Sequence, residues 1–171
     1  MSFFDLISTR HSVRAFKDKP ISEDLIEKIL MAATSAASAG NLQSYQIFVV
    51  TKDELQKKLA DAAHGQSFIK DASAVFVFCA DKKVSATEYG KRGAELYSLQ
   101  DATIACTYAQ LASHSLGLAS VWVGSFDEDE VSRILQTPSQ LRPIAMLVVG
   151  FAAEKPEVTP RRPLNELSHT V

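Results

Sequence analysis

The segment from Asp101 to Leu116 constrains the possible folds of this chain more than any other. It has helical length, carries few charges, is rich in Ala, Ser and Thr, and is followed by Gly117, a residue typical of helix ends. Its apolar residues lie nearly all around the predicted helix, so protein must cover most of its sides. We therefore expect this helix to be enclosed by other elements or by a second chain.

Four apolar runs predict the strands of a sheet. They are separated by helical segments, which places the chain in a mixed α and β class, and no internal repeat or second domain interrupts residues 1–171. The run Ala74–Ala80 contains no polar residue and directly follows Ser73. It predicts a strand that is buried on both faces. The other predicted strands span residues 46–51, 118–124 and 144–151.

Helix-start signals predict further helices. Ser22 is suited to cap a helix that begins at Glu23, Thr51 and Glu54 have capping-box spacing, and Asp127 can cap a short helix to Leu135. Residues 3–9 also predict a short helix. Residues 81–97 are polar and irregular, with no clear prediction, and the proline-containing tail 152–171 predicts an extended arm.

Composition excludes several classes of protein. Hydrophobic residues make up 46% and charged residues 22%, as in ordinary globular domains. The net charge of −2 argues against a general nucleic-acid binder, and the apolar runs are too short to span a membrane. The N-terminal residues lack the pattern of a signal peptide, and Cys79 and Cys106 in apolar runs favour reduced core thiols, so we expect a cytoplasmic location.

The cluster Arg10-His11-Ser12-Val13-Arg14 is the most informative candidate site. In an extended stretch Arg10, Ser12 and Arg14 share one face, where two guanidinium groups and a hydroxyl can hold a phosphate. A solvated surface patch is the alternative for these five residues taken alone.

Two further segments carry groups suited to a ligand. The loop Ser38–Gln43 contains small residues and the amides of Asn41 and Gln43, which can bind the edge of a heterocycle or simply end a helix. Arg161 and Arg162 lie between two prolines and form either an anion site or a charged tail. The histidine spacing predicts no metal site, and neither a phosphate-binding glycine loop nor a nucleophile elbow is present.

Four segments together resemble the signatures of the nitroreductase family of FMN-dependent oxidoreductases. They occur in the family's order and cover nearly the whole chain. The segments are Arg10–Phe16, the stretch from Ala32 through Ser38–Tyr45 to Val50, Gly117–Gly124, and Arg162–Leu164. Departures from the family pattern are Ala37 and Ser44 in place of frequent prolines, and Tyr45 in place of a frequent Trp.

The resemblance implies an α+β fold with a mixed central sheet flanked by helices, in an intertwined homodimer whose C-terminal arms are exchanged. It implies that Arg10, His11 and Ser12 hold the FMN phosphate and ribityl chain, helped by Arg161 and Arg162. Arg14 would lie near the pyrimidine ring and stabilise the reduced flavin electrostatically. The remaining implied cofactor contacts are Ser38, Ala39 and Asn41 from the partner chain, together with Gln43, Gln66, Trp122, Val123 and Gly124.

The function implied is ping-pong transfer of a hydride from NADH or NADPH, through flavin N5, to a nitroaromatic, a quinone or a similar small molecule. The flavin carries the chemistry, so no catalytic side chain is expected. Alternatives are another flavin reaction on the same fold (dehalogenation, enone reduction or flavin breakdown) and a non-catalytic FMN-binding module.

Overall fold

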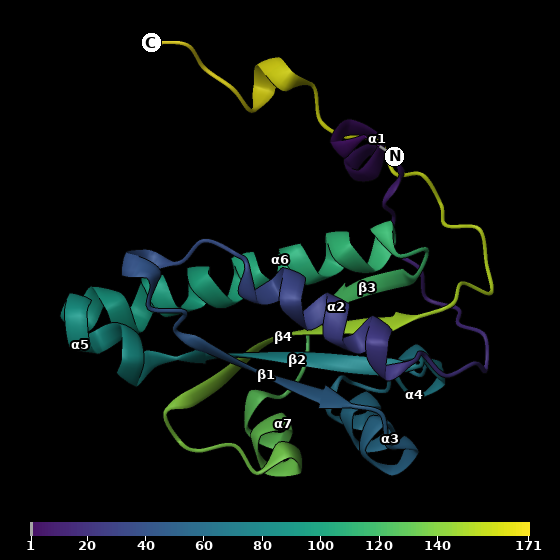
Figure 1. Cartoon of the computed structure of the whole chain (residues 1–171), viewed down its shortest axis with the longest axis horizontal. Coiled ribbons are helices and arrows are strands. Elements are labelled where there is room, and N and C mark those ends of the chain that lie inside the picture. Colours follow the sequence, from purple (N-terminus) through teal and green to yellow (C-terminus); the bar gives the residue numbers. More distant parts are fainter. Residues whose placement is uncertain (1) are drawn as a thin grey trace.

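The computed structural model describes residues 2–171 and has the expected α+β architecture of one central sheet between helices (Figure 1). Its strands follow the order β1-β2-β4-β3, and each neighbouring pair is antiparallel. A parallel pairing occurs at the isolated bridge between Ser12 and Ser120. The strands are β1 (Tyr45–Val50), β2 (Ala74–Asp81), β3 (Ala119–Val123) and β4 (Leu141–Gly150). All four agree with the predicted strands to within three residues at each end.

Helices cover both faces of the sheet. Figure 1 shows α2 (Glu23–Thr34) and α6 (Ser98–Ser115) on one face, and α3 (Asp53–Ala62) and α7 (Glu128–Leu135) on the other. The short helix α4 (Phe68–Asp71) packs with α3, while α1 (Phe3–Thr9) lies near one end of α6. The sheet thus separates two layers of core side chains.

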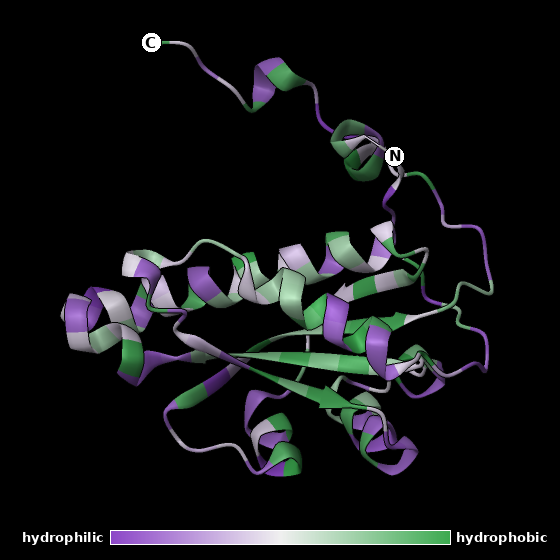
Figure 2. Ribbon diagram, viewed as in Figure 1, coloured by the Kyte–Doolittle hydropathy of each residue, from purple (hydrophilic) through white to green (hydrophobic). Residues whose placement is uncertain are grey.

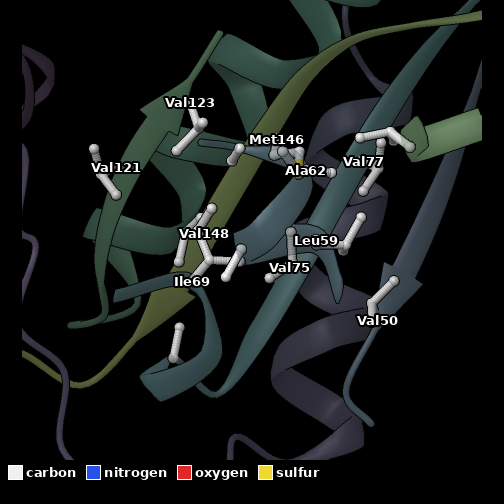
Figure 3. Close-up of a cluster of buried hydrophobic side chains, with 14 of the residues drawn as sticks. Val50, Leu59, Ala62, Ile69, Val75, Val77, Val121, Val123, Met146 and Val148 are labelled. Carbon is white, nitrogen blue, oxygen red and sulfur yellow. The ribbon is translucent and has the colours of Figure 1, made fainter. Parts of the chain in front are cut away.

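The two cores explain why β2 is apolar throughout. All eight of its residues are buried, and successive side chains enter opposite layers. Val75, Val77 and Cys79 belong to the layer beneath α3 and α7, part of which is drawn in Figure 3. Phe76 and Phe78 belong to the layer beneath α2 and α6. Both cysteines are buried and free, and burial raises the pKa of Cys79 to about 12.

Side-chain caps set several helix starts as the sequence indicates. The Ser22 hydroxyl accepts from the amide of Leu25, and the Asp127 carboxylate accepts from the amide of Glu130 at 2.9 Å. The capping box predicted at Thr51 and Glu54 is wrong. The helix begins at Asp53, so Lys52 and not Thr51 occupies the cap position of α3, and its ammonium group cannot accept hydrogen bonds from the helix amides.

The segment without a prediction, residues 81–97, is helical from Lys82 onward. Asp81 caps α5 (Lys82–Arg92), which continues into a π-helical turn, η2 (Gly93–Tyr97), and then into α6. Gly90 interrupts α5 with a φ of 54°, and Gly93 lies so close to the carbonyl of Ser85 that a side chain would collide with it. The glycines and polar side chains of residues 82–97 explain why the sequence shows no helical pattern there.

Helix α6 is buried on one side only. Asp101, Ala105, Cys106 and Ala109 pack inward, whereas Ile104 and Tyr108 are exposed in the single chain. The expected cover on that side is therefore not provided by this chain itself. Across residues 2–171, no helix has both the length and the apolar character needed to cross a bilayer.

The C-terminal arm leaves the body of the molecule, as predicted, and Figure 2 shows that it is mostly polar, with isolated apolar residues. Every residue from 157 to 171 is exposed, including Val158, Leu164 and Leu167. A short 3-10 turn, η3 (Leu164–Glu166), is its regular element. The arm begins at a bridge between Phe16 and Ala152, so its root is fixed next to the Arg10 cluster.

Candidate functional site

The Arg10–Arg14 cluster is extended and runs beside the edge strand β3. The amide of Val13 donates to the carbonyl of Ser120 at 3.1 Å, and the buried side chain of Val13 anchors the segment in the core. The alternation of an extended chain then places the neighbouring polar side chains on the outer side. A hollow of about 360 Å³ lies at this cluster. Its lining residues are Arg10, His11, Ser12, Arg14, Glu154, Lys155, Glu157, Thr159 and Arg161.

Positive charge dominates one part of this hollow. Burial lowers the pKa of Arg10, and the positive charge of Arg161 lowers it further. Within residues 2–171, Arg10, Arg14 and Arg161 form no ion pair with a carboxylate. Two guanidinium groups that line one hollow and form no ion pair there fit a bound phosphate, which each can contact bidentately.

Glu154 introduces an acidic group into the same hollow. Its Oε1 atom accepts from the amide of Arg14 at 2.6 Å and from the amide of Ala15 at 3.1 Å. Glu154 therefore accepts hydrogen bonds from backbone amides and forms no ion pair with the guanidinium groups, and it fixes the root of the arm to the cluster. The side chains of Arg10, Ser12 and Arg161 stay available to an anion.

The structure separates the two tail arginines. Arg161 lines the hollow, but Arg162 does not, and its Nε donates to Glu166 at 3.1 Å within the exposed arm. In the single chain Arg161 is therefore the tail arginine beside Arg10.

The end of β3 and the turn at Gln66 lie together. Trp122 is half-buried, Val123 is buried, and Gly124 is exposed directly after the strand. The Gln66 amide donates to the carbonyl of Ala63 at 3.0 Å and to that of Ser125 at 3.2 Å. Because both contacts use its nitrogen, Gln66 in this state offers a ligand its oxygen only, and it ties the turn to the loop after β3.

The loop from Ser38 to Ser44 has an unusual backbone. Gly40, Asn41 and Gln43 have φ angles of 56°, 57° and 48°, in the left-handed region. Inside the loop the amide of Gln43 donates to the Ser38 hydroxyl at 3.0 Å. Asn41 and Gln43 are both exposed, so their side chains are available to a ligand.

A carboxylate from α6 supports this loop from below. Asp101 accepts from the amide of Ala39 at 2.9 Å and from the Ser44 hydroxyl at 2.5 Å. Beside it lies a hollow of about 580 Å³, lined by Ala37, Ser38, Ala39, Tyr97, Leu99, Gln100, Asp101, Thr103 and Ile104.

The Arg10 cluster and the Ser38 loop lie at opposite ends of α6 (Figure 1). Asp101 contacts the loop in the first turn, and His114 in the last turn contacts the Thr9 hydroxyl at 2.9 Å. His114 lies thirteen positions after Asp101 in the helix, which is about 20 Å at 1.5 Å per residue. One chain therefore does not bring the two predicted halves of the site together.

Sequence reasoning missed Asp101, Glu154 and His114. A lone acid in a nearly uncharged helix was the available signal for Asp101, and a lone imidazole in the last turn was the signal for His114. Glu154 gave no signal, because its role depends on the chain returning to Arg14. Among residues 2–171 the structure shows no cluster of three or more His, Cys, Asp or Glu side chains suited to a metal ion.

Comparison with known proteins gives consistent matches. The model of the nitroreductase family matches residues 7–88 and 65–151. A provisionally named NADH dehydrogenase/NAD(P)H nitroreductase of Archaeoglobus fulgidus is 34% identical over 154 residues, which are 88% of this chain and 85% of that protein. An FMN reductase [NAD(P)H] of Bacillus subtilis is 30% identical over 176 residues, covering 95% and 71% of the two chains.

Solved structures of related proteins also superimpose on this chain. A nitroreductase from Bacillus subtilis superimposes with a TM-score of 0.91 at 28% identity, over 98% of this chain and 73% of the other. The NADPH:FMN oxidoreductase from Vibrio harveyi, solved in complex with NAD+, gives a TM-score of 0.89 at 28% identity, over 98% and 76%.

Proposed function

Because the chain belongs to the nitroreductase family, whose matched members are NAD(P)H oxidoreductases, we propose that it is an FMN-dependent oxidoreductase. Its reaction is hydride transfer from NADH or NADPH to a nitroaromatic, a quinone or a similar small acceptor. The observation that carries the proposal is the hollow that Arg10 and Arg161 both line, where neither guanidinium group forms an ion pair with a carboxylate of residues 2–171.

The Arg10 cluster is proposed to hold the phosphate end of the cofactor. Arg10 and Arg161 supply charge, and the Ser12 hydroxyl supplies a further donor. Ser12 is bridged to Ser120, so the rigid sheet edge fixes the position of these donors. In the single chain the side chain of Arg162 pairs with Glu166. Arg162 could therefore contact the same phosphate only if the C-terminal arm took a different path.

Arg14 is proposed to act on the ring electrostatically. It is exposed and lines the same hollow as Arg10, one position beyond the buried Val13. A fixed positive charge near the pyrimidine ring favours the reduced, more negative flavin. When bound, FMN would supply the hydride-carrying chemistry at its N5 atom, so no general acid or base is required of the protein.

The other half of the site is proposed to come from a second chain. The Ser38–Gln43 loop lies about 20 Å along α6 from the Arg10 cluster, too far for both to surround one ring system from the same chain. A two-fold homodimer places the loop of one chain beside the cluster of the other and creates two equivalent sites. The exposed Ile104 and Tyr108 of α6, together with the exposed apolar residues of the arm, provide a surface for this contact.

Flavin binding tests the proposal directly. The purified protein should bind FMN at least ten times more tightly than riboflavin, because the phosphate adds charge-assisted hydrogen bonds. Arg10→Ala should lose most of this difference, whereas Arg133→Ala, which removes a surface arginine paired with Glu130 on α7, should retain it. Fluorescence titration measures both affinities.

Anaerobic addition of NADH or NADPH then tests turnover. Bleaching of the bound flavin, followed by reoxidation on addition of a quinone or nitroaromatic, is expected. Tight FMN binding without bleaching by either nucleotide would favour a binding module, and equal affinity for FMN and riboflavin would refute the phosphate site.

A further inference from the structure

Asp101 is an unusual residue in its surroundings. Its exposed fraction is only 2%, and among residues 2–171 it has no ion pair with a Lys, Arg or His. A buried carboxylate without a cation is costly unless its oxygens accept hydrogen bonds. Here both oxygens do so, and both donors, the Ala39 amide and the Ser44 hydroxyl, come from the Ser38–Ser44 loop.

The loop needs external support. Gln43 and Asn41 have left-handed φ angles, which cost energy for residues other than glycine and persist only where surrounding contacts enforce them. The hydrogen bond from Gln43 to Ser38 closes the loop but does not attach it to the protein. Asp101 attaches it at both ends, at Ala39 and at Ser44, on either side of the strained residues.

The position of Asp101 makes the attachment rigid. It lies in the first turn of α6, between Ser98 and Ala102, which are both fully buried. Ser44 is fully buried as well and directly precedes β1. A charge-assisted hydrogen bond between two such buried groups is stronger than one between neutral groups. The carboxylate therefore joins the loop to both the helix and the sheet.

We propose that Asp101 is a positioning residue for the flavin, because it holds the Ser38–Ser44 loop in the strained conformation that presents Asn41 and Gln43 to the ring. This inference rests on the proposed function for its ligand, but the attachment itself exists without flavin. The carboxylate does not touch the cofactor, and it acts through the loop backbone.

Substitutions at Asp101 and Ser44 separate positioning from general stability. Asp101→Ala removes both acceptors. Asp101→Asn has the same shape and retains one acceptor for the Ala39 amide, while its nitrogen can donate to the Ser44 oxygen. Ser44→Ala removes one contact only. Ser113→Ala is the matched control, because Ser113 is fully buried on the same helix and donates to the Ala109 carbonyl at 2.8 Å, away from the loop.

The first measurement is hydrogen exchange of the flavin-free protein. In Asp101→Ala the amides of residues 38–45 should exchange at least tenfold faster, while amides of β2 and β4 exchange as in the wild type. Ser113→Ala should leave the exchange of the loop unchanged. Unchanged loop exchange in Asp101→Ala would overturn the inference.

The second measurement is FMN affinity. We expect the dissociation constant to increase about tenfold in Asp101→Ala, which corresponds to 1.4 kcal/mol, and by a smaller factor in Ser44→Ala. Asp101→Asn should stay within about threefold of the wild type, a rescue that follows from its remaining hydrogen bonds. Equal affinities in the wild type and Asp101→Ala would overturn the inference, as would equal losses in Asp101→Ala and Ser113→Ala.

These measurements also distinguish a failure of the inference about Asp101 from a failure of the proposed function. If the wild type binds no FMN, the proposed function is wrong, and the exchange experiment still decides whether Asp101 holds the loop. If the wild type and Asp101→Ala bind FMN equally well, the function stands and the role of Asp101 is refuted. Should Asp101→Ala not fold, Ser44→Ala decides through the same two measurements, and wild-type loop exchange together with wild-type FMN affinity in this variant would overturn the inference.

Discussion

His114 lies among groups that disfavour its protonation. Burial lowers the pKa of its imidazole, and the positive charge of Arg10 lowers it further, with a contribution from His11. The ring contacts the Thr9 hydroxyl and so joins the last turn of α6 to the segment that leads into Arg10. Protonation therefore adds charge to a part of the molecule that is already positive.

The stability of the folded chain should depend on pH through this residue. The unfolded chain binds the proton with a pKa near 6.5, and the folded chain binds it only at lower pH. The free energy of unfolding should therefore decrease as the pH falls from about 6.5 through the folded pKa. His114→Gln should show a smaller decrease between pH 7.5 and pH 5.5 in urea titrations. His169→Gln, in the exposed arm, serves as the control, and an identical pH dependence in wild type and His114→Gln would contradict the expectation.

Some residues of the candidate site could be predicted from the sequence, and others could not. The Arg10–Arg14 cluster was recognisable because its alternation places like groups on one face, and the structure brings these groups together with Arg161. Asp101 and Glu154 were not recognisable as site residues, because each acts on backbone amides that are distant in sequence. Such roles depend on tertiary contacts and leave no local pattern.

At the scale of elements, apolar periodicity was a reliable guide and polar composition was not. Each strand was predictable because a buried sheet requires consecutive or alternating apolar residues. The helical segment 82–97 was not, because Gly90 and Gly93 argue locally against a helix. There the packing of Gly93 against Ser85 and the edge-on stacking of Tyr89 with Tyr97 outweigh local propensity.

Helix α5 also touches the Ser38–Ser44 loop, and two glycines permit a matched test of this contact. A Cβ atom on Gly40 would lie 2.5 Å from the Tyr89 hydroxyl, whereas one on Gly65 would meet nothing within 4 Å. Both glycines have positive φ angles. Gly65→Ala should therefore cost about 1 kcal/mol of stability from backbone strain alone, and Gly40→Ala should cost more because of the collision.

The substitution Tyr89→Phe provides the second part of this test. It removes the hydroxyl that the new methyl group would meet, so it should recover part of the stability lost in Gly40→Ala. Urea unfolding of the two single variants and the double variant measures the coupling between them. Strictly additive effects would show that Tyr89 does not restrict the loop at Gly40.

The whole molecule has the form of an incomplete unit. One side of α6 is open, the arm extends into solvent, and the two halves of the proposed site lie at opposite ends of one helix (Figure 1). The sequence suggested the first two features through an apolar helix and a proline-containing tail. The separation of the two halves became apparent only once α6 was placed between them, because sequence distance does not report spatial distance.

Mixing of inactive variants tests whether two chains share each site. If Arg10→Ala and Asn41→Ala are each inactive, a mixed dimer has one site with both substitutions and one with neither. Random mixing makes about half of the dimers mixed, so roughly a quarter of all sites should regain the wild-type composition. Activity of the refolded mixture should rise to about that fraction, while each variant refolded alone stays inactive. Absence of recovery, with subunit exchange verified by mass tags, would assign both segments to the same chain's site.

The central position of β2 also determines the order in which the molecule can be assembled during synthesis. β2 pairs on one side with β1, which precedes it, but its other neighbour is β4, which ends at Gly150. Until that strand leaves the ribosome, β2 (Ala74–Asp81) has one edge without a partner strand. Pairings between strands so distant in sequence form slowly, and unpaired edges of apolar strands favour aggregation. The yield of folded protein should therefore depend on synthesis rate and temperature more than its final stability would suggest.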